Sequence, residues 1–145
     1  MHDLERNRQV VERLLAAADA GDHDLVRRFF GADYVDHDPS EARRGASPLV
    51  VLEQAFEQFR LAFDDVRHTL HETIAERDLV AARISVAAIH RRPLFGIPPS
   101  GRLICNDSIV VYRVRDARIV ERWCRERRPT RELLLEAGRR PGPEP

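Results

Sequence analysis

The chain has 145 residues, of which 43% are hydrophobic and 33% charged, a composition typical of one folded domain rather than of a disordered or membrane-spanning chain. Its 24 basic and 24 acidic residues cancel, so no net field would draw it to nucleic acid or to an anionic membrane. All the basic residues are arginines, and without lysine Schiff-base chemistry and a Walker-type phosphate loop are excluded. Residues 1–13 do not resemble a signal peptide and no apolar run could span a bilayer, so we expect a cytoplasmic protein without membrane partners.

Apolar residues with helical spacing dominate the first part of the chain. They predict an amphipathic helix over residues 4–20 and a short second helix over residues 22–30, each ended by a glycine. Residues 34–44 contain a proline and several charges, and we interpret them as extended chain and loop. A third helix begins at residue 47 and carries an apolar stripe that includes Phe59.

After Asp65 the pattern changes to β-branched residues punctuated by turns, which predicts strands. The expected strands cover residues 66–75, 79–90, 102–114 and 118–126. We favour a three-residue connection over 115–117, because Ala117 does not readily adopt the positive φ of a two-residue hairpin turn. A last short helix is expected over 130–137.

Helices followed by an antiparallel meander predict an α+β fold, with N-terminal helices packed in a curved antiparallel β-sheet. Twist accumulates across four or five long strands, so the sheet should curl around the third helix and enclose an apolar pocket. We expect a single domain over residues 1–138 and a flexible C-terminal tail over residues 139–145.

The strongest candidate acid lies in the last predicted strand. Alternation places Ile119, Glu121 and Trp123 on one face and Val120, Arg122 and Cys124 on the other. If the first face meets the pocket, desolvation raises the pKa of Glu121 and suits it to general acid/base catalysis. The alternative is that Glu121 faces solvent or pairs with an arginine such as Arg113.

Asp107, on the neighbouring predicted strand, is a second candidate acid. A three-residue connection places it on the face of Glu121, whereas a two-residue connection turns it away. The alternative for Asp107 is a solvated strand residue.

Histidines supply the remaining polar candidates. His37, in the segment 34–39, could hydrogen-bond a substrate carbonyl if this segment folds over the pocket, and otherwise it is an exposed loop residue. The same two interpretations apply to His90. The other internal histidines, His23, His68 and His71, have no metal-ligand spacing, so no metal site is predicted.

Several motifs together resemble the SnoaL-like polyketide cyclases. The most specific are the loop Gly-Ile-Pro-Pro-Ser-Gly-Arg at 96–102 and the Ile-x-Glu-x-Trp strand at 119–123, supported by Tyr-Val-Asp-His-Asp-Pro at 34–39. The resemblance implies the nuclear-transport-factor-two-like cone. It also implies cofactor-free chemistry on a polyketide-like small molecule, namely ring closure by intramolecular aldol condensation in secondary-metabolite biosynthesis.

The resemblance also implies roles for individual residues. Glu121 matches the catalytic acid and Asp107 a second polar group of the site. The predicted substrate-binding residues are His37, Trp123, Tyr34, His90 and Phe59. One position departs from the pattern, because many relatives carry an aspartate four residues after the tryptophan, where this chain has Arg127.

Two other functions use the same pocket. One is a pericyclic, Diels–Alder-type closure that depends on pocket shape without a base, and the other is a non-catalytic small-molecule-binding or accessory protein. A nucleic-acid role ranks last, since acidic residues interrupt the arginines of the C-terminal part. We also expect a homodimer, because Val120 and Cys124 would leave the outer sheet face too apolar to stay exposed.

Overall fold

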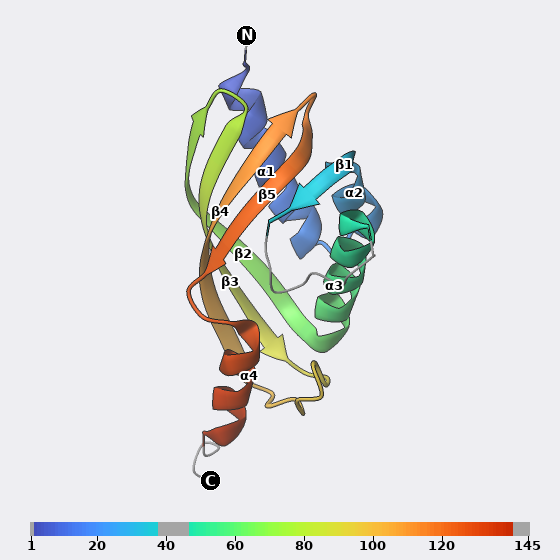
Figure 1. The fold of residues 1–145 in the computed structure, drawn as a ribbon. Coiled ribbons are helices and arrows are strands. Elements are labelled where there is room, and N and C mark those ends of the chain that lie inside the picture. Colours follow the sequence, from blue (N-terminus) through green and yellow to red (C-terminus); the bar gives the residue numbers. More distant parts are fainter. Residues whose placement is uncertain (1, 38–46, 141–145) are drawn as a thin grey trace.

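Helices lie against the concave side of a strongly curved sheet in the computed structural model, which describes residues 2–37 and 47–140 (Figure 1). The described elements are α1 (Leu4–Asp19), α2 (His23–Arg28), β1 (Phe30–Asp36), α3 (Pro48–Ala62), β2 (Phe63–Glu76), β3 (Leu79–His90), β4 (Leu103–Arg115), β5 (Arg118–Glu126) and α4 (Thr130–Arg139). The α+β class and the cone of helices within a curved sheet are therefore as predicted. Within the described ranges no helix is long and apolar enough to cross a membrane.

A capping side chain and a proline account for where α1 and α3 begin. The Asp3 carboxylate accepts a hydrogen bond from the Arg6 amide at 3.0 Å and so caps α1. The inward stripe of α1 includes Val11, which is fully buried. Pro48 occupies the first turn of α3, where its missing N–H costs nothing.

The second helix is shorter than predicted and is followed by a strand that the sequence analysis assigned to helix and loop. α2 ends at Arg28, and Phe30 begins β1 because burial of Phe30 and Tyr34 in the core outweighs the helical spacing. Gly31 also allows this close approach, since a Cβ there would lie only 3.2 Å from Val120 Cγ1.

The five strands are ordered β1-β5-β4-β3-β2, and β1 adds a parallel edge to the predicted antiparallel meander. Its register pairs Val35 with Glu121 and Asp36 with Arg122. Residues 86 positions apart thereby become neighbours, which the sequence analysis did not anticipate.

The β4–β5 hairpin corrects two further predictions. Its turn has two residues, with Asp116 at φ 50° and Ala117 at φ 59°, so the expected three-residue connection is wrong. Ile119 pairs with Val114 while Glu121 pairs with Arg113, which leaves one extra residue in β5. This β-bulge breaks the alternation of side chains, so Ile119 and Glu121 lie on opposite faces of the sheet. The prediction that they share a face is therefore also wrong.

The two ends of the described chain bear on the predicted boundaries. α4 extends through Arg139, and the Arg140 carbonyl accepts a hydrogen bond from Arg102 at 3.1 Å, so residue 139 is part of a helix rather than of the predicted tail. Residues 141–145 of that tail lie outside the described residues, as does the 38–44 part of the predicted loop.

Candidate functional site

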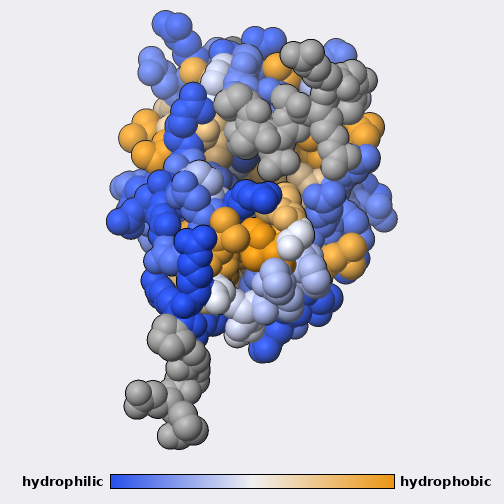
Figure 2. Space-filling view, turned by 60° about the horizontal axis from the view of Figure 1, so that its bottom comes forward, coloured by the Kyte–Doolittle hydropathy of each residue, from blue (hydrophilic) through white to orange (hydrophobic). Residues whose placement is uncertain are grey.

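The concave side of the sheet encloses a cavity of about 800 Å³. α1, α3 and the start of α4 complete its wall, which is mostly apolar and includes Phe30, Phe59 and Ile84. Figure 2 turns the lower end of Figure 1 toward the viewer and shows hydrophobic residues at the centre, with hydrophilic residues around them. A cavity of this size and polarity is typical of a small-molecule site.

The cavity wall carries an ion pair between β5 and β1. Arg122 projects from β5 and its Nη1 lies 3.1 Å from Asp36 Oδ2, at the end of β1. Both side chains are about 23% exposed. The parallel pairing of β1 with β5 sets this contact, and the bulge in β5 turns Arg122 inward.

Two tyrosines support the ion pair. The Tyr34 hydroxyl donates to Asp36 Oδ2 at 2.6 Å, and burial together with this hydrogen bond raises the pKa of Tyr34. Burial alone would lower the pKa of Arg122, but its interactions with Tyr112 and Asp36 raise it above the ordinary value. Burial also raises the pKa of Tyr112. The guanidinium therefore stays cationic while both phenols stay neutral.

Further polar groups meet the cavity from other strands. Asn106 and Ser108 come from β4, and the Asn106 amide donates to the Arg128 carbonyl at 2.8 Å. His68 comes from β2, and its Nδ1 lies 2.6 Å from Asp19 Oδ1. Cys124 also lies inward and is buried, which corrects its predicted place on the outer face.

Glu121 lies on the opposite side of the sheet from this cavity. It is among neither the cavity wall nor the core, and its carboxylate bonds to Arg113 Nε at 3.1 Å and to His37 Nε2 at 3.2 Å. His37 stacks on Trp123 with ring centroids 4.8 Å apart. The structure thus brings three predicted site residues together, but on the outer face, as in the alternative that pairs Glu121 with Arg113.

The electrostatics of Glu121 also differ from the prediction. Partial burial raises its pKa, but the hydrogen bonds from His37 and Arg113 outweigh burial and hold the pKa below its ordinary value. A carboxyl that ionises so readily is a weak proton acceptor near neutral pH. Its catalytic role stays a prediction without support from this geometry.

Asp107 shares the outer face with Glu121, as the favoured register predicted, although for another reason. The two-residue turn would have separated the two acids, and the bulge in β5 restores the common face. Asp107 accepts a hydrogen bond from Ser85 at 2.6 Å, which with Arg127 lowers its pKa. Arg127 pairs with it at 3.5 Å, outside the cavity.

The other predicted binding residues divide between wall and core. Phe59 lies on the cavity wall, and its role in binding stays a prediction. Tyr34 is buried behind the wall, where it packs edge-on against Phe30 at 4.9 Å between centroids. His90 is fully buried, with its ring centroid 5.3 Å from that of Phe63. Burial lowers the pKa of His90.

Sequence reasoning did not select Arg122, Asp36 or His68. Arg122 stands between Val120 and Cys124 in the sequence, and an arginine flanked by apolar residues on one strand face was a usable signal. His68 was considered only as a metal ligand. Its hydrogen-bond partner, Asp19, lies 49 positions away, so local spacing could not reveal this pair. The described residues contain no group of three or more side chains that could hold a metal ion.

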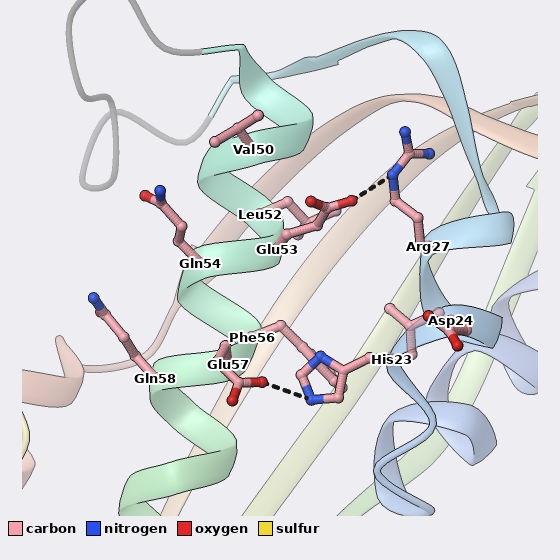
Figure 3. Close-up of a pocket in the computed structure, with 11 residues that line it drawn as sticks. His23, Asp24, Arg27, Val50, Leu52, Glu53, Gln54, Phe56, Glu57 and Gln58 are labelled. Atoms are coloured by element: carbon pink, nitrogen blue, oxygen red, sulfur yellow. Dashed lines mark hydrogen bonds and ion pairs between the residues drawn. The ribbon is translucent and has the colours of Figure 1, made fainter.

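A second hollow, of about 600 Å³, lies between α2 and α3 (Figure 3). Its polar side chains pair across it: Arg27 Nε lies 2.5 Å from Glu53, and His23 Nε2 lies 3.2 Å from Glu57. These ion pairs tie the two helices together and engage most of the charged groups of this hollow, Asp24 being the exception.

Solved structures with the same fold come from several bacteria. AclR from Streptomyces galilaeus, provisionally called a hydroxylase, is 24% identical with a TM-score of 0.80, over 96% of this chain and 100% of that one. IdmH from Streptomyces antibioticus, provisionally called a polyketide cyclase, is 24% identical with a TM-score of 0.76, over 94% and 98% of the two chains. A SnoaL-like protein from Jannaschia is 14% identical with a TM-score of 0.77, over 97% and 98%.

These likenesses establish the fold, which is the nuclear-transport-factor-two-like cone that the motifs implied. A comparison with curated protein sequences found no match. The family model for SnoaL-like polyketide cyclases matches residues 8–126, which include most of α1, the full sheet and every cavity group on it. The chain therefore belongs to the SnoaL-like polyketide cyclase family.

Proposed function

We propose that the chain is an enzyme that holds a polyketide-like molecule in the cavity and closes or isomerises its carbon skeleton by acid–base chemistry. The observation that carries this proposal is the Arg122 guanidinium, held cationic on the wall of a mostly apolar cavity. Its Nη1 pairs with Asp36 and the guanidinium also bonds to Tyr112, and a fork with five N–H donors can in addition meet a ligand oxygen.

The chemistry follows from where charge develops. A methylene between two carbonyls loses a proton to give an enolate, whose negative oxygen a buried guanidinium stabilises better than water does. The enolate carbon then attacks a second carbonyl of the same chain, a C–C bond forms, and the new alkoxide takes up a proton. The cavity wall supplies orientation, which for a unimolecular closure is a large part of the barrier.

The proposed setting follows the family. We propose a secondary-metabolite pathway in the cytoplasm, and chemistry that needs no cofactor for an aldol-type step. We also propose a homodimer that forms through the outer face of the sheet, where Leu103 and Ile109 of β4 are 63% and 58% exposed.

Proton exchange in a simple 1,3-diketone tests the central step. Benzoylacetone in D₂O exchanges its methylene protons through the enolate, and we expect the wild-type protein to accelerate the loss of the methylene NMR signal. Arg122→Met should reduce this acceleration by a factor of about 10²–10³, the usual effect of removing a group that stabilises an oxyanion.

Arg83→Met is the matched control, because Arg83 pairs with Glu72 away from the cavity. It should exchange at the wild-type rate, and circular dichroism should show each variant folded. Wild-type protein that accelerates no exchange, or a folded Arg122→Met that exchanges as fast, would contradict the proposal. Calorimetric binding of the diketone without exchange would favour the non-catalytic binding function.

A further inference from the structure

The cavity holds a second polar constellation, on β2 rather than β5. His68 lies on the inner side of β2 opposite Val86, and Asp19 ends α1. The His68 amide donates to both oxygens of the Asp19 carboxylate at 3.0 Å, and the ring Nδ1 lies 2.6 Å from Oδ1. One carboxylate therefore fixes both the backbone and the ring of His68.

The ring has a defined orientation toward the cavity. His68 is part of the cavity wall whereas Asp19 is not, so the Nδ1 edge faces away from the cavity and the opposite edge meets it. A carboxylate at 2.6 Å accepts the Nδ1 proton, which leaves the lone pair on Nε2. Within residues 2–37 and 47–140, no group forms a hydrogen bond with this Nε2.

Other carboxylates near the cavity are engaged differently. Asp36 already accepts from Tyr34 and pairs with Arg122, so its lone pairs point at donors rather than at a ligand. Glu126, at the end of β5, lines the same cavity and also has an interaction partner. His68 is left as the cavity group with a tautomer suited to accept a proton.

We infer that His68 is the catalytic base of this cavity and that Asp19 is its positioning residue. The inference rests on the proposed function and adds the proton acceptor to it. Nε2 takes the proton from the substrate methylene, the C–H electron pair becomes the enolate, and Asp19 stabilises the imidazolium. After the C–C bond forms, the proton passes from Nε2 to the new alkoxide, which restores the neutral ring.

A Kemp elimination isolates this base from the rest of the mechanism. In 5-nitrobenzisoxazole a base removes the C3 proton, the N–O bond breaks, and the coloured 2-cyano-4-nitrophenolate forms without any enolate. We expect the wild-type protein to catalyse this reaction, and His68→Gln to lower kcat by a factor of about 10²–10⁴, the usual contribution of a general base.

His71→Gln is the matched control, because His71 is on the same strand but binds Ser85 instead of lining the cavity. It should react at the wild-type rate. Asp19→Asn should lower kcat without changing KM, and ¹⁵N NMR of the His68 ring should show loss of the Nδ1-protonated tautomer. A merely structural role for Asp19 would leave that tautomer unchanged.

The outcomes separate the two proposals. Equal Kemp rates for the wild-type protein and a folded His68→Gln would overturn the inference, whatever the diketone result. Kemp activity that depends on His68, together with no exchange of benzoylacetone, would retain the base and overturn the proposed function.

Discussion

Adjacent side chains of β5 show how finely burial separates charged groups. Arg122 faces the cavity and keeps its charge because Asp36 and two tyrosines surround it, whereas Glu121 faces outward, where it pairs with Arg113 and hydrogen-bonds to His37. A partly buried pair of this kind is costly to break, since removal of one partner leaves the other charge without compensation. Arg122 and Asp36 should therefore tolerate substitution less well than the residues of the outer face.

Glu121 gives a prediction for stability as a function of pH. Its folded-state pKa lies below its ordinary value of 4.5, so the folded state binds this proton less readily than the unfolded chain. The stabilisation is fully present above pH 4.5 and is lost as pH falls through the folded pKa. Glu121→Gln should lower the free energy of unfolding by about 0.5–1 kcal/mol at pH 7, as expected for a partly exposed pair.

Urea unfolding followed by circular dichroism measures this difference. The gap between wild type and Glu121→Gln should close in acid, below the folded pKa. Exchange of benzoylacetone should be unchanged in the variant, because Glu121 does not line the cavity. A constant stability gap across the pH range, or strongly reduced exchange, would contradict this account and restore the predicted catalytic role.

At the scale of elements, the two-residue turn and the bulge decide which residues of β5 face the cavity. The turn requires positive φ at Asp116 and Ala117, a conformation that residues with a Cβ adopt at a cost in free energy. The Ala117 side chain is partly buried and packs against the core, which offsets part of this cost. The hairpin therefore stores local strain that the surrounding packing offsets.

Ala117→Gly should relieve that strain. We expect the free energy of unfolding to rise by about 0.5–1 kcal/mol, because glycine adopts positive φ without the Cβ penalty. The midpoint of urea unfolding measures the change. Ala87→Gly, in the middle of β3, is the control and should be destabilising, since glycine weakens a regular strand. An Ala117→Gly variant as destabilised as Ala87→Gly would show that packing, not φ, dominates at the turn.

Regular elements of this fold could be predicted from the sequence, because spacing and caps are local signals. α1 and α3 follow from their apolar stripes, and β2 to β5 follow from β-branched runs with turns between them. β1 could not be predicted, since its partner is about 86 positions away and its seven residues show no strand alternation. The bulge in β5 could not be predicted from local sequence either. It turns Glu121 to the outer face of the sheet and Arg122 to the cavity, the opposite of the predicted arrangement.

At the scale of the whole molecule, the sheet has a cavity on one side and, on the other, a largely charged face that also exposes Leu103 and Ile109. Ile109 lies on that surface between Arg83 and Arg125 of the neighbouring strands. An apolar residue 58% exposed in the middle of a sheet is better explained by a covered face than by a solvated one.

Ile109→Asp should convert the proposed homodimer to a monomer, because it replaces an exposed apolar side chain of the proposed contact with a charge that would have to be desolvated. Light scattering after size exclusion gives the mass directly. Leu61→Asp is the control, since Leu61 is comparably exposed, at 51%, but lies on α3. A wild-type protein that elutes as a monomer at all concentrations would refute the dimer.

The parallel pairing of β1 with β5 also has a consequence for synthesis on the ribosome. β1 emerges from the ribosome early, whereas β5, the strand with which it pairs, emerges late. Asp36 therefore cannot pair with Arg122 until most of the chain has been synthesised. Until then the edge of β1 and its apolar residues have no sheet to join. A nascent chain stalled before residue 118 should thus lack a closed cavity, and the ion pair on its wall can form only in the final stage of folding.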